Sequence, residues 1–379
     1  MNPLDARLDA LRGSRPPVPH NARTLAALTA NPGCDRRALL DAAGVDKDAL
    51  ATHLGLPRPL RSSRLALDHA AAFEHRVTVH GGAELVRLLR ETLGLTIPEV
   101  SYEDVNSVGS DSPSPLLLRH AHTRSRILSA AKGTSDPRTL LDHPVLRLTV
   151  AGHQVYLEPD VVAFQHHGTF HIVEIKPFAV IDGQADSAKL TAAVTQAAAH
   201  VLALQELLAD EDLPPECVSD SVILVNPLNF SSRPVATLVN ARQKIKSLSR
   251  LLGRLRRLPE LLDRLPPGTT FDLAVGPDNT PTRPRGELTD ALAATRPLYT
   301  PGCRQLCDLA FYCRSEARNR GTTGALGTKV RDDTAGIDTT ATALALTDGH
   351  LHPSRDQDDI TQALRHAHRV HADLLAGLA

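Results

Sequence analysis

Two carboxylates and one ammonium group fall within residues 157–177, whose β-branched and aromatic side chains predict two strands. If the turn between them lies at residues 166–168, residues whose numbers sum to 334 face each other, and Asp160 lies opposite Glu174. Lys176 shares the face of Glu174 because side chains alternate along a strand. Like charges placed opposite each other destabilise a sheet, and a divalent cation would compensate them. The alternative is an ion pair of Glu174 with Lys176 at a sheet edge, with Asp160 in a turn.

Three of the five cysteines, Cys303, Cys307 and Cys313, lie within eleven residues. Iron–sulfur clusters take four cysteine thiolates, and zinc accepts the same donors. The fourth ligand would be Cys34 or Cys217, which stand far away in the sequence. The pattern therefore predicts an iron–sulfur cluster, with a structural zinc site or free buried thiols as alternatives.

A basic stretch covers residues 240–258, which the spacing of the leucines predicts as one amphipathic helix. It carries seven arginines and lysines with no acidic residue between them. Positions three and four apart share a helix face. The positive face that we expect to bind DNA phosphates consists of Arg242, Lys246, Arg250, Arg254 and Arg257. The alternative is a solvated helix face without a partner.

The ordered set of motifs resembles the PD-(D/E)XK nuclease superfamily over about residues 30–315. Residues 159–160 match its PD motif, and residues 174–176, with the sequence EIK, match its E-x-K motif. Within the superfamily the chain is similar to RecB-type exonucleases, and among these to the CRISPR-associated and AddB-like subgroup. That subgroup carries an iron–sulfur cluster held by four cysteines.

Two further motifs of the subgroup are present in altered form. On the helix before the sheet, Glu74 ends the sequence AAAFE, where the subgroup has glycine four residues before its metal ligand. On the helix after the E-x-K motif, Gln196 is followed four residues later by His200, where the subgroup has tyrosine. The subgroup also places its first cluster cysteine before the nuclease core, which identifies Cys34 as the fourth ligand.

The resemblance implies hydrolysis of phosphodiester bonds to 5′-phosphate and 3′-hydroxyl ends. Lys176 would orient the attacking water or a phosphate oxygen. The helix face with Gln196, His200 and Lys189 would meet the scissile phosphate or a flanking base. The implied ligands of one or two Mg²⁺ or Mn²⁺ ions are Glu74, Asp160, Glu174 and the backbone carbonyl of Ile175. The implied ligands of a 4Fe–4S cluster are Cys34, Cys303, Cys307 and Cys313.

These residues require a framework of strands and helices to position them. We expect strands between residues 145 and 178 and at 221–227, and helices at 63–95, 117–132 and 187–209. The expected fold class is α/β, with a mixed central β-sheet flanked by helices, a restriction-endonuclease-like core, and helical N- and C-terminal wraps. The expected segments are an N-terminal part with the first cysteine (1–60), a helical region with Glu74 (61–140), the nuclease core with the basic helix (141–265), the cysteine region (266–320), and a flexible tail with a terminal helix (321–379).

The composition excludes several classes of protein. The 42 basic and 43 acidic residues give a net charge of −1, so any contact with nucleic acid has to be a local patch. The sequence has no apolar run long enough for a transmembrane helix and no recognisable signal peptide, which predicts a cytoplasmic protein without membrane contact. The odd number of five cysteines argues against a secreted disulfide framework.

Together the motifs predict a metal-dependent deoxyribonuclease that acts on single-stranded DNA or DNA ends and carries a structural iron–sulfur cluster. Its protein partners would belong to a defence or repair system. One alternative is a catalytically inactive, nucleic-acid-binding relative in such a complex. Another is an interaction protein stabilised by zinc.

Overall fold

The computed structural model describes residues 3–18, 24, 27, 31–57, 64–94, 101–112, 114–134, 139–150, 153–166, 168–181, 183–229, 231, 233–253, 257–278, 280–334 and 336–376. The chain forms two compact units, each assembled from separate stretches of sequence. The first unit comprises Met1–Pro17, Ala30–Leu60 and Leu262–Ala379, and the second comprises Val18–Thr29 and Arg61–Leu261. The expected segments 61–140 and 141–265 therefore fall almost entirely in the second unit.

The second unit contains a mixed six-stranded sheet with the order β1-β2-β5-β6-β9-β10, which confirms the α/β class. β1 is parallel to β2 and β6 is parallel to β9, while the other neighbours are antiparallel. The strands of this sheet are β1 Ser101–Asp104, β2 Thr139–Asp142, β5 Val161–His166, β6 Thr169–Ile175, β9 Ser221–Pro227 and β10 Pro234–Asn240. Two separate hairpins consist of β3 (Leu146–Val150) with β4 (His153–Leu157), and of β7 (Val180–Ile181) with β8 (Gln184–Ala185).

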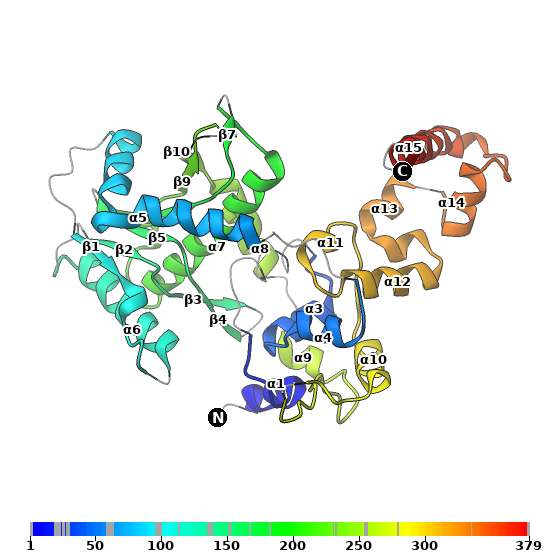
Figure 1. Cartoon of the computed structure of the whole chain (residues 1–379), viewed down its shortest axis with the longest axis horizontal. Coiled ribbons are helices and arrows are strands. Elements are labelled where there is room, and N and C mark those ends of the chain that lie inside the picture. Colours follow the sequence, from blue (N-terminus) through cyan, green and yellow to red (C-terminus); the bar gives the residue numbers. More distant parts are fainter. Residues whose placement is uncertain are drawn as a thin grey trace. The chain divides into compact units, whose positions relative to one another are not determined.

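Helices pack on this sheet (Figure 1). α5 (Arg64–Leu93) buries an apolar face against Val173 and Ile175 of β6, among other strand residues. Because side chains alternate along a strand, Glu174 points to the opposite face. There α7 (Ser187–Ala209) packs against β6. The unit also contains α6 (Pro115–Ala131), α8 (Arg242–Gly253) and the short 3₁₀ helices η1 (Val105–Ser107) and η2 (Pro215–Cys217).

The β5–β6 hairpin has the expected register next to Asp160. Val161 pairs with Val173 and Val162 with Ile172, so the paired numbers sum to 334 as predicted. A bulge before His166 then shifts the register near the turn. This register determines which residues of β5 and β6 are direct cross-strand neighbours.

The long helix expected at residues 63–95 is interrupted in the middle. Between Val79 and Gly82 the backbone leaves the helical conformation, and His80, Gly81 and Gly82 have φ values of 57°, 65° and 70°. A Cβ atom at Gly82 would lie 2.6 Å from Cδ2 of Tyr102. Only glycine combines a left-handed backbone with this close approach to β1.

The first unit is helical in its described residues. Its N-terminal and C-terminal stretches are joined by backbone hydrogen bonds, from Phe271 N to Leu11 O (2.7 Å) and from Arg36 N to Arg296 O (3.1 Å). Its helices are α1 Pro3–Arg12, α3 Asp35–Ala42, α4 Lys47–His53, α10 Arg285–Ala293, α11 Cys303–Leu306, α12 Ala310–Arg320, α13 Thr328–Asp333, α14 Thr340–Thr347, α15 Asp358–Ala376 and the 3₁₀ helices η3 Thr323–Leu326 and η4 Arg355–Gln357. The border between the units falls within α9 (Leu258–Leu262).

Two expectations about irregular structure were wrong. Residues 101–104, which lie outside every strand that we expected, form the edge strand β1. The tail expected to be flexible after residue 320 forms α13 and α14 before α15. Threonines that suggested a loop instead cap helices, since Thr339 accepts a hydrogen bond from the Thr342 N–H at the start of α14.

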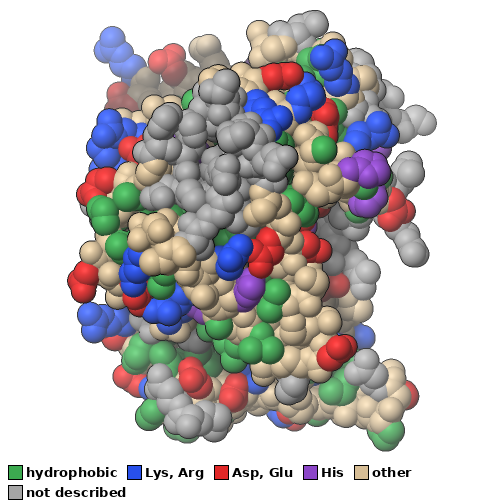
Figure 2. Space-filling view, turned by 90° about the vertical axis from the view of Figure 1, so that its left-hand side faces the viewer, with side chains coloured by type: hydrophobic (Ala, Val, Ile, Leu, Met, Phe, Trp, Pro, Cys, Tyr) green, Lys and Arg blue, Asp and Glu red, His purple; other side chains and the backbone are tan. Residues whose placement is uncertain are grey.

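Acidic and basic side chains are interspersed on the face of the molecule shown in Figure 2, in keeping with the net charge of −1. One stretch of α7 in the described part of the chain, Lys189–Ala209, is long and apolar enough to cross a membrane by length and composition alone. Most of that stretch is buried inside the protein, as in the core helix of a folded domain.

Candidate active site and cysteine cluster

Asp160 lies directly before β5 and is tied to β6 through its carboxylate. Oδ2 accepts hydrogen bonds from the backbone N–H of Ile175 (2.6 Å) and from Lys176 Nζ (3.0 Å). The Asp160 backbone carbonyl accepts the N–H of His143 (2.9 Å). The side chain is 17% exposed, so one edge of the carboxylate can meet a ligand from solvent.

Glu174 lies in β6 with no exposed surface. Its Oε2 is 2.7 Å from Lys176 Nζ, and its Oε1 is 2.5 Å from Nδ1 of His200 on α7. Lys176 therefore lies between two carboxylates, those of Asp160 and Glu174. The three residues singled out by the PD and E-x-K motifs meet at one point.

The two carboxylates differ in their affinity for protons. Burial raises the pKa of Asp160 to about 6, and the charge of Glu174 adds to this rise while Lys176 opposes it. Burial would also raise the pKa of Glu174, but the charges of Lys176 and His200 outweigh it and lower this pKa to about 2. The same carboxylates raise the pKa of Lys176 well above its usual range in spite of burial. Glu174 is thus the ionised partner of Lys176, and Asp160 is the carboxyl group that titrates near neutral pH.

Glu74 of α5 belongs to the same site. Its charge is among the causes that raise the pKa of Asp160. Its Oε1 is 2.9 Å from Nε2 of His143, whose Nδ1 is 3.1 Å from Oδ1 of Asp142. The adjacent carboxylates of Asp142 and Glu74 raise the pKa of His143 to about 10, which favours the imidazolium form between them at neutral pH.

Sequence reasoning missed His143 and its acidic neighbours. Asp104, Asp142 and His143 place one ligand atom each within 4.8 Å of one another. Asp104 and Asp142 are aligned because β1 and β2 pair in parallel, and Tyr102 donates a hydrogen bond to Asp142. The available signal was the Asp-His pair at 142–143, but no strand was expected at residues 101–104 to place Asp104 beside it.

Glu74, Asp160 and Glu174 do not place their oxygen atoms within 4.8 Å of one another in this structure, but their chemistry matches that of ligands for a hard divalent cation. Glu74, Asp160 and Glu174 supply carboxylate oxygens, which Mg²⁺ and Mn²⁺ prefer. Burial is the largest cause of the raised pKa of Asp160, and repulsion by the charges of Glu174 and Glu74 adds to it while Lys176 opposes it. A cation at this place would relieve that repulsion.

The α7 residues of the predicted DNA-facing stripe have different surroundings. His200 has no exposed surface and contacts Glu174, so in this structure it positions a carboxylate and does not reach DNA. The expected contact of His200 with DNA is therefore corrected. Gln196 lies one turn earlier and is half-buried, and Lys189 is exposed near the start of the helix. The described contacts tie neither of them to Asp160 or Glu174.

The four predicted cluster cysteines all lie in the first unit. Cys34 precedes α3, Cys303 begins α11, Cys307 follows that helix, and Cys313 lies in α12. Cys34 is close enough to Cys303 for their charges to interact, and Cys313 interacts in the same way with Cys307 and Cys34. The other possible ligand, Cys217, belongs to the second unit, in η2.

Cationic side chains surround these thiols. The Arg36 guanidinium donates a hydrogen bond to Cys313 Sγ (3.2 Å), and the charge of Arg37 acts on Cys307. Burial nevertheless raises the pKa of Cys34 and Cys307, and raises the pKa of Cys313 to about 12. Burial therefore favours the protonated thiol at these three cysteines, and an iron or zinc ion would have to displace the protons.

The spacing of the sulfur atoms bears on the choice of metal. A single zinc ion binds thiolates at about 2.3 Å, which places tetrahedral sulfur ligands about 3.8 Å apart. Among the described residues, no three cysteines place their sulfur atoms within 4.8 Å of one another. A four-iron cluster holds its sulfur ligands further apart because each of them binds a different iron. No three of these sulfur atoms are thus spaced for a single zinc ion in this structure, and the iron–sulfur cluster stays a prediction.

The basic helix is shorter than expected. α8 ends at Gly253, so Arg257 is outside it, and Arg254 lies outside the described residues. Arg242, Lys246 and Arg250 are exposed on α8, opposite the buried Ile245 and Leu248. Arg242 pairs with Asp220 at 3.1 Å. Three residues of the predicted stripe thus share α8, and whether the stripe binds DNA stays a prediction.

No family profile and no curated protein matches the sequence. One solved structure that does match is described as the crystal structure of SSO0001, with 14% identity and a TM-score of 0.18. The match covers 45% of this chain and 83% of that one. A likeness at that TM-score carries no argument about fold or function.

Proposed function

We propose that the second unit is a metal-dependent deoxyribonuclease with a restriction-endonuclease-like core. The observation that carries the proposal is the meeting of Asp160 and Glu174 at Lys176 Nζ, at 3.0 Å and 2.7 Å, with Glu74 beside Asp160. Burying two carboxylates and an ammonium group together has a large desolvation cost. The PD and E-x-K motifs that supply these residues point to phosphodiester hydrolysis.

Glu74, Asp160, Glu174 and the Ile175 carbonyl would hold Mg²⁺ or Mn²⁺. The bound ion would stabilise negative charge on the phosphate and make a water nucleophilic at neutral pH. Lys176 supplies a compact positive charge that orients a phosphate oxygen or the attacking water. His200 holds Glu174 in place from behind through its Nδ1.

The first unit would carry a 4Fe–4S cluster on Cys34, Cys303, Cys307 and Cys313, with zinc as the alternative ion. The substrate would be single-stranded DNA or DNA with free ends, in the cytoplasm, and protein partners would come from a defence or repair system. An inactive DNA-binding relative is the second candidate. The replacement of the motif tyrosine by the buried His200 favours it, because a tyrosine hydroxyl is then missing at the substrate.

A cleavage assay tests the proposal. Single- and double-stranded DNA labelled at the 5′ or 3′ end is incubated with the purified full chain and Mn²⁺ or Mg²⁺. We expect cleavage of single strands or ends that EDTA abolishes and that Asp160→Ala reduces at least a hundredfold. Loss of cleavage in Lys176→Ala, with unchanged circular dichroism, would assign the same role to the lysine. Full activity of Glu174→Ala would contradict the site, and inactivity of the wild type with retained DNA binding would favour the inactive relative.

A further inference from the structure

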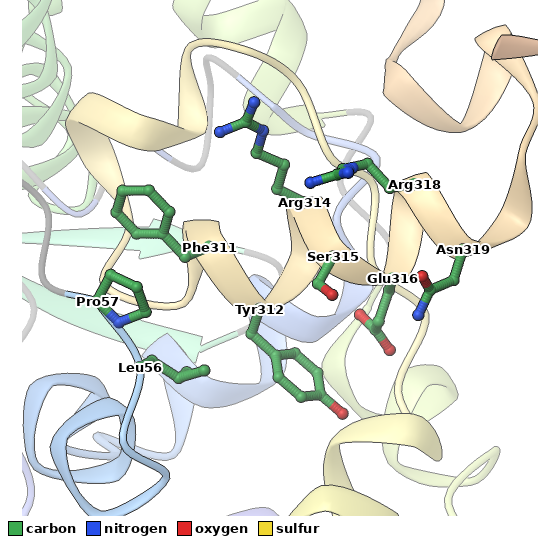
Figure 3. Close-up of a pocket in the computed structure, with 9 residues that line it drawn as sticks. All are labelled: Leu56, Pro57, Phe311, Tyr312, Arg314, Ser315, Glu316, Arg318 and Asn319. Atoms are coloured by element: carbon green, nitrogen blue, oxygen red, sulfur yellow. The ribbon is translucent and has the colours of Figure 1, made fainter.

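A groove of about 460 Å³ lies along the exposed face of α12, in the first unit. Figure 3 shows Ser315 in the middle of this face, with Arg314 and Arg318 on one side and Tyr312, Glu316 and Asn319 on the other. Phe311 lies beside Pro57 at one end, where Leu56 completes the lining. The volume is in the range of sites that hold small ligands or single nucleotides.

The groove is positively charged. Arg314 and Arg318 are both exposed, and no salt bridge is found for either in the described part of the chain. Glu316 does not offset them, because its carboxylate is paired with the guanidinium of Arg36 at 2.6 Å. Arg36 is itself buried beneath α12 and donates to both carboxylate oxygens of Glu316. Two arginine charges are therefore left to bind an anion.

The same groove offers aromatic faces. Phe311 and Tyr312 are half-buried, so part of each ring faces the groove. The guanidinium of Arg36 lies 5.2 Å from the centre of the Tyr312 ring, and that of Arg304 lies 5.7 Å from the centre of the Phe311 ring. These cations fix the rings in place. Fixed aromatic rings beside exposed arginines are the arrangement that binds single-stranded nucleic acid, in which bases stack and phosphates pair with arginine.

We propose that this α12 groove binds nucleotides of single-stranded DNA. Arg314 and Arg318 contact phosphates, Phe311 and Tyr312 stack on bases, and Ser315 with Asn319 offers hydrogen bonds to base edges. The inference rests on the proposed function for the identity of the nucleic acid, but it concerns a surface of the first unit. An acidic polypeptide would use the two arginines but would gain nothing from the aromatic rings.

The test measures binding without catalysis. Fluorescence anisotropy of a labelled twenty-nucleotide oligothymidylate is followed at several salt concentrations, with the full chain and without Mg²⁺ or Mn²⁺. We expect Arg314→Ala with Arg318→Ala to weaken binding about tenfold or more and to reduce the log–log salt slope by about 1.4, or about 0.7 for each lost phosphate contact. Phe311→Leu should weaken binding about tenfold without a change of slope, since stacking releases no counterions.

The matched control is Lys329→Ala with Arg331→Ala on α13. It removes the same charge from the same unit, but these side chains are already paired with Asp333 and Asp332. The control should leave the slope unchanged.

Equal salt slopes in the wild type and in the double variant of Arg314 and Arg318 would overturn the proposal. An equal loss of slope in the control variant would overturn it as well. Competition by polyglutamate as strong as by oligothymidylate, with no effect of Phe311→Leu, would assign the groove to an acidic protein instead. The assay does not depend on Asp160, so loss of cleavage in the Asp160→Ala protein leaves its outcome unaffected.

Discussion

Asp160 and Glu174 are chemically alike, yet their surroundings give them different properties. Glu174 has two cationic or hydrogen-bonding partners, Lys176 and His200, and no exposed surface. Asp160 shares the same lysine but also has two carboxylates nearby, those of Glu74 and Glu174. Burial disfavours the ionised form of both groups, and the neighbouring charges outweigh burial at Glu174 but not at Asp160.

Replacing Asp160 by asparagine should stabilise the metal-free protein at pH 7. The pKa of about 6 in the folded protein is above the usual value, so Asp160 favours folding below about pH 4 and this contribution is lost as the pH rises through 6. At pH 7 the ionised carboxylate costs about 1–3 kcal/mol. We expect urea titrations in EDTA to show the variant more stable by that amount, with a much smaller difference near pH 4.

Glu174→Gln is the opposite case and serves as the control. The lowered pKa of Glu174 contributes stability above the usual pKa of about 4.3, and this contribution is lost as the pH falls toward 2. The glutamine variant should therefore be less stable than the wild type at pH 7, because Lys176 and His200 lose a buried charged partner. If Asp160→Asn is the less stable variant and Glu174→Gln the more stable one, the two roles are reversed.

At the scale of elements, α8 carries the clearest positive face of the second unit. Ile245 and Leu248 are buried, while Lys246 and Arg250 are exposed on the other side without a salt bridge among the described residues. We predict that Lys246→Ala with Arg250→Ala weakens DNA binding at all sequences and lowers the salt slope by about 1–2. Arg242→Ala should change the slope less, because Arg242 is already paired with Asp220. An unchanged slope in the double variant, measured by anisotropy at several salt concentrations, would mean that α8 faces solvent or a protein.

The sequence predicted those elements that have a strong local pattern. The alternation in residues 157–177 determines the register of β5 with β6, and the apolar stripe of 187–209 matches α7 residue for residue. Other elements depend on distant partners. β1 is half-exposed and is held by β2 and by the contact of Tyr102 with Gly82, none of which its own four residues reveal. This explains why the Asp104, Asp142 and His143 group was missed.

The helices after residue 320 were also missed because their formation depends on more than local composition. Its glycines and threonines suggested loose structure, but Gly321 ends α12 in a left-handed conformation with a φ of 68° and Thr322 and Thr339 cap the helices that follow. Glycine and threonine are common both in loops and at the ends of helices. Only the surrounding sequence and its contacts show which of the two structures forms. The basic helix was predicted to run to residue 258, but Arg257 is not helical in the structure although it lies inside a leucine-rich pattern.

At the scale of the whole molecule, the order of the units in the chain gives the cysteines a structural role. The first unit is built from three stretches, and most of the second unit is inserted between Leu60 and Leu262. Cys34 belongs to the stretch before this insertion and the other three cysteines to the stretch after it. A cluster would therefore link two stretches that are separated by about two hundred residues, and closing so long a loop stabilises the folded unit.

This connectivity predicts which part of the protein a lost cysteine destabilises. Metal binding is coupled to folding, so a missing ligand weakens the unit that holds the cluster. Anaerobically purified Cys34→Ser, Cys303→Ser, Cys307→Ser and Cys313→Ser should each lose the broad absorbance near 400 nm expected of an iron–sulfur cluster. In differential scanning calorimetry, their first unit should unfold at a lower temperature while the transition of the second unit stays in place.

Cys217→Ser is the matched control, because Cys217 lies in the second unit and is a half-buried thiol of η2. It should keep the absorbance and both transitions. Bleaching by Cys217→Ser but not by Cys34→Ser would mean that the fourth ligand was misassigned. A colourless wild-type protein that contains one zinc ion per chain would instead assign the four thiols to zinc. Even with zinc bound, Cys34→Ser should still lower the unfolding temperature of the first unit. Loop closure requires one ligand from each stretch of the chain, whichever metal the ligands bind.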